Sequence, residues 1–542
     1  MKDALLLLTF LLSLAVITPA RASATQAQAI PPDSSLQQQA DAAYQKGMQL
    51  LNAKRFQEAL EQFREVEAKA PQSPQGSTGQ GIALALLGRP QEAIQALERA
   101  LKIDSSFWVA RRELGIVYWT QNRRDEAARE LEPLSKLHPD DAPVNVILGE
   151  YTFGRQDYFG ALAYLSRVPA QVSADARLSL MEAEALLKTG QTPAAADRLK
   201  SLVGRPGLTP DQTFEFAWLL GQAKLYKEAI AEFQKVPADF PDPFRHTYGL
   251  ALAFFSDGQY QQCVEGLQAL AARGNARPEL FALWGVAEEK NGHTKEAYDA
   301  FRQGILSNPR DPLNYLNIAT LACEHLNYDL AVQILTSGIE RIPESHALVL
   351  SRGIAYTLKT QFVMARQEYN RALQMEPDDP ACYMALGLLQ LETGDLDGAS
   401  HSFAESARLG PEEPRAYYFL AEALMQKGVA PGTAAFDQAR EAVDKALALD
   451  ASFAYAYLDR AKLELKANQM DEAIRDLERA RKVDSKSSSV VYLLAQAYQR
   501  KGDKAKAQEY FARVKETTAE EDREFRRNAL TQALVVLSKP SQ

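Results

Sequence analysis

Residues 114–139 read LGIVYWTQNRRDEAARELEPLSKLHP, and the spacing of small, large and helix-breaking residues in this stretch recurs along the chain. Gly115 is followed twelve residues later by Ala127 and four residues after that by Leu131, and Pro139 closes the stretch. Two helices approach closely only where one of them carries almost no side chain, and proline cannot continue a helix. The stretch therefore predicts two antiparallel helices that meet at Gly115 and Ala127.

The small residue at position 115 belongs to a series with a period of 34 residues. Its members are Gly47, Gly81, Gly115, Gly149, Ala183, Ala217, Ala251, Gly285, Ala319, Gly353, Gly387 and Ala421. Ala461 and Ala495 continue the series after six extra residues, because 495 − 47 = 448 = 13 × 34 + 6. We therefore expect fourteen repeats, rather than the three or four domains that 542 residues would otherwise indicate.

A second small residue follows each member of the series, normally after twelve residues, and a large apolar residue comes four residues later. The second small residues are Ala59, Ala93, Ala127, Ala161, Ala195, Ala229, Cys263, Ala297, Ala331, Ala365, Ala399, Ala439, Ala473 and Ala507. We expect them at the contact between the two helices, with the large residue filling the adjoining space. Glycines in turns such as Asp257-Gly258 and Asn291-Gly292 favour helix ends. These patterns predict an all-α fold.

The third and tenth repeats carry a motif that resembles the tetratricopeptide repeat (TPR) family. It comprises Leu114-Gly115-x-x-Tyr118, Ala127-x-x-x-Leu131 and Pro139 in the third repeat, and Gly353-x-x-Tyr356, Ala365-x-x-x-Tyr369 and Pro377 in the tenth. The resemblance covers residues 40–517 and implies a right-handed α-solenoid of helix–turn–helix repeats. The fourth, fifth and seventh repeats have Ser173, Gly207 and Asn275 in place of the closing proline, so we expect irregular packing at those junctions.

The resemblance also implies that the first helices line a concave groove, through repeat positions 2, 5, 9, 12 and 13 when the small residue of the series is position 8. The candidate groove contacts are Tyr44, Arg112, Trp119, Phe153, Phe214, Trp218, Tyr248, Phe255 and Tyr418. Exposed aromatic side chains in a groove are typical anchors for a peptide or a partner protein. The alternative is that these residues pack as ordinary core. Position 5 never carries Lys and position 9 never carries Asn, so the carboxylate clamp of some family members is absent.

Residues 1–24 have the features of a secretory signal peptide. An apolar run from Ala4 to Ile17 is shorter than the roughly 20 residues that a membrane-spanning helix needs. Small residues then allow cleavage after Ala22 or Ala24; the alternative is an uncleaved anchor. We expect residues 25–39, which are rich in Gln, Pro and Ser, to form a disordered tether, and the mature protein to be periplasmic or extracellular.

Composition and motifs argue against several kinds of activity. The net charge of −9 disfavours a nucleic-acid-binding surface, and three cysteines cannot form a disulfide framework. The six histidines are scattered without a metal-binding pair, and no nucleophile or phosphate-binding motif occurs in the context that its chemistry requires. We therefore expect no catalytic site, no cofactor and no metal. Cys263 replaces an alanine at a helix contact, and we do not expect Cys323 and Cys382 to pair.

Two further segments depart from the plain repeat. The six-residue insertion near residues 429–438 falls in the turn of the twelfth repeat, where we expect neutral lengthening; the alternative is a local contact site. Thr518 and Glu521 form a capping box that predicts a C-terminal capping helix within residues 518–542. An array of repeats needs such a partly polar end.

The function expected from these observations is that of an exported, non-enzymatic scaffold. It would bind protein or peptide partners in its groove, as part of an envelope complex that serves cell-envelope assembly or secretion. One alternative is the regulatory or substrate-recruiting arm of a glycosyltransferase or hydrolase on another chain. Another is a self-assembling structural protein, because the sequence leaves the oligomeric state open.

Overall fold

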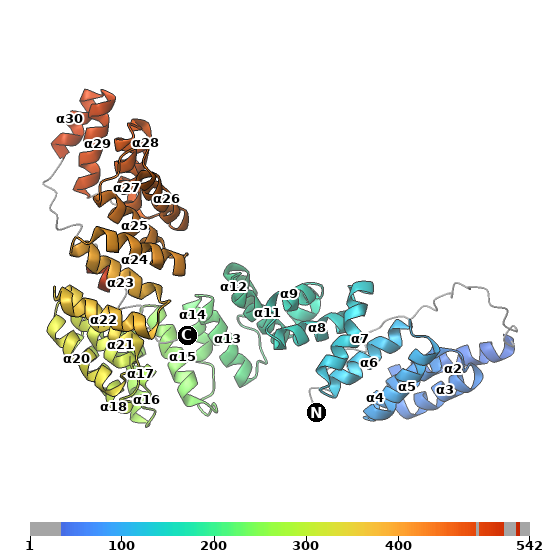
Figure 1. Ribbon diagram of the computed structural model, residues 1–542. Coiled ribbons are helices and arrows are strands. Elements are labelled where there is room, and N and C mark those ends of the chain that lie inside the picture. The colour runs from blue at the N-terminus through green and yellow to red at the C-terminus, as the bar shows by residue number, and fades with distance from the viewer. Residues whose placement is uncertain (1–33, 484–486, 514–526, 532–542) are drawn as a thin grey trace. The chain divides into compact units, whose positions relative to one another are not determined.

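The computed structural model describes residues 34–483, 487–513 and 527–531. Helices α2 to α30 supply a first and a second helix for each of the fourteen expected repeats, with α10 as an additional short helix. Figure 1 shows the helices in chain order. No β-strand occurs in the described ranges. The predicted all-α solenoid of helix–turn–helix repeats is therefore confirmed.

The chain divides into two compact units, Met1–Ala253 and Phe254–Gln542. The helices of the first unit are α2 (Ser34–Asn52), α3 (Phe56–Lys69), α4 (Pro74–Leu86), α5 (Pro90–Ile103), α6 (Trp108–Thr120), α7 (Arg124–Leu137), α8 (Ala142–Gly154), α9 (Tyr158–Leu165), α10 (Pro169–Ala174), α11 (Ala176–Lys188), α12 (Thr192–Lys200), α13 (Pro210–Gln222) and α14 (Tyr226–Phe233). The division falls within α15 (Pro243–Ser256).

The second unit continues the same alternation of first and second helices. Its helices are α16 (Tyr260–Ala272), α17 (Pro278–Lys290), α18 (Thr294–Ser307), α19 (Leu313–Glu324), α20 (Tyr328–Arg341), α21 (His346–Leu358), α22 (Phe362–Met375), α23 (Pro380–Glu392), α24 (Leu396–Leu409), α25 (Pro414–Gln426), α26 (Ala434–Leu449), α27 (Ala454–Lys466), α28 (Met470–Val483), α29 (Ser488–Lys501) and α30 (Lys504–Arg513). Within each unit, second helices pack on their own first helix and on the next one, as α24 does on α23 and α25. Successive first helices also touch, as α25 and α27 do.

The small residue of the first helix lies against the large residue of the second helix. A Cβ atom added at Gly115 would lie 2.5 Å from Cγ of Leu131, and one at Gly353 would lie 2.6 Å from Cε1 of Tyr369. The same contact recurs where Gly47, Gly81, Gly149, Gly285 and Gly387 face Phe63, Leu97, Leu165, Phe301 and Phe403. The second-helix alanines Ala59, Ala93, Ala127, Ala161, Ala229, Ala297, Ala331, Ala365 and Ala399 have no exposed surface.

Every turn between the two helices of a repeat contains at least one residue with a left-handed backbone; the turn of the twelfth repeat contains a second one, Gly432. Seven of these residues are Gly88, Gly190, Gly258, Gly292, Gly394, Gly428 and Gly502. The other seven are Lys54, Asn122, Gln156, Lys224, Leu326, Thr360 and Asn468. The turn geometry is thus conserved within the chain even where glycine is absent, at a steric cost for side chains that carry a Cβ.

The second helices of the fourth, fifth and sixth repeats are shortened. α9, α12 and α14 have 8, 9 and 8 residues, whereas α5 and α7 have 14. Pro169 and Pro237 follow α9 and α14, and two glycines with positive φ, Gly204 and Gly207, follow α12. The sequence led us to expect irregular junctions in the fourth and fifth repeats but not in the sixth. The seventh repeat has a second helix, α16, of 13 residues.

The two ends of the array differ from the sequence-based expectations. Residues 34–39, expected to belong to a disordered tether, begin α2, because glutamine is a good helix former and Gln37 bonds to Asp41 one turn later. The expected signal peptide and the rest of the tether lie outside the described residues. The described part of the expected capping helix, residues 527–531, places Ala529 and Leu530 in the core cluster of Tyr315, Phe403 and their neighbours. The last repeat, α29 and α30, belongs to a separate core cluster, which does not include Ala529 or Leu530.

The six extra residues of the twelfth repeat are divided between the turn and the following helix. The turn covers residues 427–433, whereas the corresponding turn of the next repeat covers residues 467–469. α26 begins at Ala434, five residues before Ala439, whereas α28 begins three residues before Ala473. Val429 and Phe436 are buried and hold the insertion against the core. Across the described ranges, no helix combines the length and the apolar character needed to cross a membrane.

Candidate functional site

Three successive first helices of the second unit, α25, α27 and α29, form a hollow of about 420 Å³. Its lining residues are Glu422, Met425, Gln426, Asp459, Lys462, Leu465, Lys466, Leu493, Gln496 and Arg500. The hollow combines apolar side chains with side chains of both signs of charge. Such a surface suits a peptide segment better than a small apolar ligand.

The repeat register explains why these residues come together. Eight of the lining residues fall at repeat positions 9, 12 and 13: Glu422, Met425 and Gln426 in α25, Lys462, Leu465 and Lys466 in α27, and Gln496 and Arg500 in α29. Positions 9, 12 and 13 share one helix face, since residues three and four apart are neighbours. Because the first helices stack side by side, equivalent positions of successive repeats form one surface.

Two cationic side chains at position 13 lie at this surface. Lys466 is exposed and donates from Nζ to the carbonyl oxygen of Val429 over 3.4 Å, and Arg500 is exposed and donates to the carbonyl oxygen of Leu465 over 3.2 Å. Carbonyl oxygens do not neutralise a cation. Both side chains therefore keep charge available for a carboxylate of a bound segment.

The acidic residues of the hollow are held within it. Asp459 is 2% exposed and accepts from Nζ of Lys462 over 2.7 Å through Oδ1. Its second oxygen, Oδ2, has no hydrogen-bond partner within the described part of the chain. Gln426 donates to Glu422 over 3.0 Å. The hollow can thus offer an acceptor at Asp459 as well as donors at Lys466 and Arg500.

One helix of the hollow, α27, also carries a buried glutamate, Glu464, which does not line the hollow. Desolvation raises the pKa of Glu464 to about 7, and the negative charge of Asp476 raises it further in the same direction. Oε2 of Glu464 has no hydrogen-bond partner among the described residues. Arg460 instead pairs with Asp444 and Asp476, at 2.8 Å and 2.5 Å. The carboxyl group of Glu464 therefore gains a negative charge near neutral pH in a poorly hydrated place.

Four of the residues predicted from the sequence to contact a ligand are engaged in packing. Trp119, Phe214 and Tyr418 are 8%, 3% and 6% exposed. Arg112 pairs with Glu113 and with Asp141, and its guanidinium lies over the ring of Trp108. These contacts agree with the alternative that the side chains belong to the core.

The other five candidate residues are half-buried against aromatic neighbours. Tyr44 packs on Phe63, Phe153 on Tyr158, Trp218 on Phe214, Tyr248 on Phe244, and Phe255 on Tyr260. The structure brings Phe214 and Trp218 together with Phe240 in one aromatic cluster. The predicted contacts do not converge on one pocket.

The polar hollow was not predicted from the sequence, because the predicted groove contacts are mainly aromatic residues. The repeat positions nevertheless indicate this surface, since the hollow uses positions 9, 12 and 13, which the family resemblance places in the groove. Lys466 and Arg500 occupy position 13 in successive repeats. The charged residues at these positions are therefore the sequence feature that indicates this surface.

The cysteines and histidines are the remaining side chains that could carry chemistry. Burial raises the pKa of the thiols of Cys263 and Cys323 to about 12, which disfavours a thiolate nucleophile. All three cysteines are free, as expected. The histidines show no metal-binding pair in the sequence, but in the structure Nε2 of His346 lies 3.2 Å from Sγ of Cys382. The two residues are 36 positions apart, so only the stacking of repeats brings them together.

Two family models, each described as a tetratricopeptide repeat, match the chain. One matches residues 44–106 and 384–432, and the other matches residues 84–145 and 464–532.

The chain is similar to several curated proteins at low identity. It is 20% identical over 299 residues to anaphase-promoting complex subunit 3 of Schizosaccharomyces pombe, and the aligned region covers 54% of this chain and 43% of that protein. It is 23% identical over 218 residues to DnaJ homolog subfamily C member 3 of Homo sapiens, which covers 37% of this chain and 43% of that protein. The matches thus span less than half the length of both relatives.

Among solved structures, the Cut9–Hcn1 hetero-tetramer of the APC/C has a TM-score of 0.38 at 14% identity, covering 86% of this chain and 98% of that one. Yeast Tom70 has a TM-score of 0.37 at 16% identity, covering 92% and 96%.

Proposed function

The chain is a tetratricopeptide repeat protein, and from this premise we propose that it is a non-enzymatic scaffold that binds a segment of a partner protein. The binding surface is the hollow on α25, α27 and α29. The observation that carries the proposal is the convergence of positions 9, 12 and 13 from three successive first helices on one hollow. A repeat array offers many such positions in a row, which suits an extended or helical segment.

The chemistry of the hollow defines the segment that it would bind. Met425, Leu465 and Leu493 supply apolar contact, and Lys466 and Arg500 supply two cations. A segment with an apolar residue next to a carboxylate would satisfy both features. Contacts of this kind make binding weaker at high salt.

A site-specific photo-crosslinker tests this assignment in the organism that makes the protein. We expect a crosslinker at Gln496, which lines the hollow, to capture a discrete partner, and Lys466→Glu together with Arg500→Glu to abolish the product. A crosslinker at Lys445, exposed on the second helix α26, is the matched control. Equal capture from both positions, or capture that survives the charge reversal, would exclude the hollow as the binding site.

We also propose that residues 1–24 direct export and that the scaffold acts in the cell envelope. Support comes from the apolar run of Ala4 to Ile17 and the small residues after it. Fractionation of cells that carry a C-terminally tagged protein measures this directly. Recovery of the tagged chain in the cytoplasm with residues 1–24 intact would contradict export and leave the binding proposal standing.

A further inference from the structure

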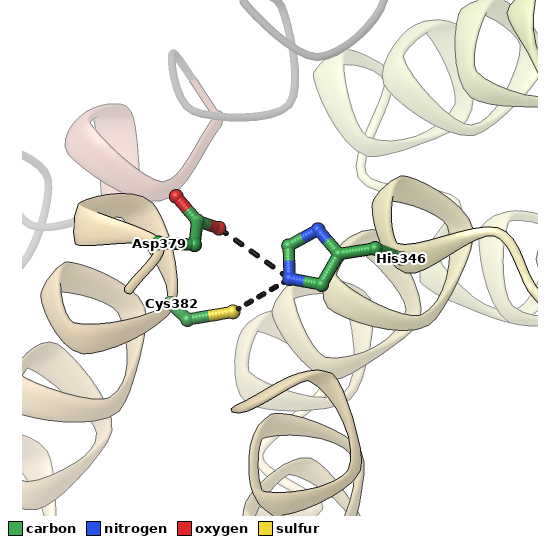
Figure 2. Close-up of side chains that lie close together, drawn as sticks. All are labelled: His346, Asp379 and Cys382. Carbon is green, nitrogen blue, oxygen red and sulfur yellow. Dashed lines mark hydrogen bonds and ion pairs between the residues drawn. The ribbon is translucent and has the colours of Figure 1, made fainter. Parts of the chain in front are cut away.

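The junction between the tenth and eleventh repeats brings together three side chains that bind metals. His346 is the first residue of α21, Asp379 is the N-cap of α23, and Cys382 lies in the first turn of α23. Both helices are first helices of their repeats, so their N-terminal ends lie next to each other. Figure 2 shows the imidazole of His346 pointing between the carboxylate and the sulfur.

The ligand atoms of the cluster lie within 4.8 Å of one another, close enough to share a small cation. Nε2 of His346 lies 3.2 Å from Sγ of Cys382 and 3.5 Å from Oδ2 of Asp379. Around zinc, ligands lie about 2.0–2.3 Å from the metal, so two ligands of a tetrahedral site are roughly 3.3–3.6 Å apart. Nε2 of His346 faces both partners, and an ion would lie between the three atoms.

The surroundings of the cluster orient its ligands. Asp379 accepts from the backbone N–H of Ala381 through Oδ1 over 2.9 Å, which leaves Oδ2 turned towards His346. The other ring nitrogen of His346, Nδ1, lies 3.8 Å from Oε2 of Glu376. Histidines that bind metals commonly have a carboxylate at the second nitrogen, which fixes the ring and its tautomer.

The cluster is buried but has access to solvent. The side chains of His346 and Asp379 are 10% and 17% exposed, and Cys382 has no exposed surface. A hollow of about 520 Å³, lined by residues 375–380, includes Glu376 and Asp379. Solvent therefore reaches the cluster at Asp379, although His346 and Cys382 do not line this hollow.

The other repeats provide an internal reference for these positions. Where His346 stands, other first helices begin with Pro210, Pro278, Pro380 and Pro414. Where Cys382 stands, other repeats have Val144, Leu280 and Leu348, each with no exposed surface. A histidine and a cysteine thus occur at facing positions of one junction. The His346 position is most often proline or alanine in the other repeats, whereas the Cys382 position is polar in three of them, at Gln212, His246 and Asn314.

We propose that His346 Nε2, Asp379 Oδ2 and Cys382 Sγ bind a zinc ion that links α21 to α23. Mixed nitrogen, sulfur and carboxylate ligands suit zinc rather than calcium or magnesium, which prefer oxygen alone. Binding requires the thiolate, so it releases a proton. Because the two helices belong to different repeats, the ion stabilises the junction between them.

The experiment uses the full mature chain, purified without a polyhistidine tag and stripped with a chelator. Elemental analysis and calorimetry after addition of zinc are expected to give one ion per chain and a raised melting temperature. Cobalt(II) is expected to give a thiolate-to-metal charge-transfer band. Cys382→Ser and His346→Gln should weaken zinc binding by more than about 100-fold, and Glu376→Gln by about 10–100-fold.

Cys323→Ser is the matched control, since Cys323 is buried, free and outside the cluster. It is expected to keep one ion, the cobalt band and the thermal shift. If Cys382→Ser does not fold, Asp379→Asn replaces it, because asparagine preserves the N-cap while removing the charge. Absence of the cobalt band in the unaltered chain, or binding that survives these substitutions, would overturn the proposal and leave only hydrogen bonds within the cluster.

Discussion

At the scale of single residues, the buried charge of Glu464 is the feature with the clearest consequence. The pKa of its carboxyl group is raised to about 7 in the folded chain, chiefly by desolvation. A raised pKa means that the folded state holds the proton more tightly than the unfolded state does. The stabilisation is complete below pH 4.5, the ordinary value, and is lost as the pH rises through 7.

Glu464→Gln keeps the shape of the side chain and removes its ionisation. We expect the variant to match the unaltered chain at pH 4 and to be more stable at pH 8.5 by roughly 1–3 kcal/mol, because no charge is then buried without a partner. Denaturant unfolding at both pH values measures the difference. Glu441→Gln, at an exposed position of α26, should show no such pH dependence. A constant difference at both pH values would contradict the assignment.

At the scale of helices and turns, the left-handed turn residue shows where the sequence signal is incomplete. Glycine marks seven of the fourteen turns, but Thr360 and Leu326 adopt φ values of 59° and 58° in the same place. The backbone geometry is imposed by the packing of the two helices, so side chains that disfavour it are tolerated. Glycine alone would have located only half of the turns.

Thr360→Gly is expected to stabilise the tenth repeat. A β-branched residue with positive φ is strained, and relief of the strain should exceed the entropy cost of glycine by about 0.5–1 kcal/mol. Thermal unfolding measures the gain. The converse variant Gly394→Thr, in the turn of the next repeat, should lose about 1–2 kcal/mol. Destabilisation by Thr360→Gly would mean that its side chain makes a contact that outweighs the strain.

At the scale of the whole molecule, each repeat touches its neighbours along the chain, so stability is expected to be local. Gly353→Ala would push a Cβ into Tyr369, and Gly115→Ala would push one into Leu131. Each change should cost about 1–3 kcal/mol of local stability. Gly221→Ala is the control, because its added Cβ meets no atom within 4 Å.

Hydrogen exchange followed by mass spectrometry shows where the loss occurs. Gly353→Ala is expected to speed exchange in α19 to α24 and to leave α2 to α7 unchanged, whereas Gly115→Ala should do the reverse. Gly221→Ala should change neither region. Equal acceleration throughout the chain for either variant would show that the array unfolds as one cooperative unit.

The sequence by itself determined the number of repeats, the helix pairs and their contacts, because these depend on residues within one period. Gly115, Ala127 and Leu131 are close in sequence and meet through the packing of two adjacent helices. Prolines that end helices are also visible in the sequence, and Pro169 accounts for the shortened α9.

Only the tertiary structure decided which side chains share a surface. Stacking of successive first helices makes Lys466 a neighbour of Arg500 and His346 a neighbour of Cys382. The 34-residue period alone does not show which side chains of successive repeats face each other. Burial of Trp119 and Tyr418 likewise depends on the neighbouring helices. Repetition encodes the scaffold, while the chemistry on its surface arises from contacts between repeats.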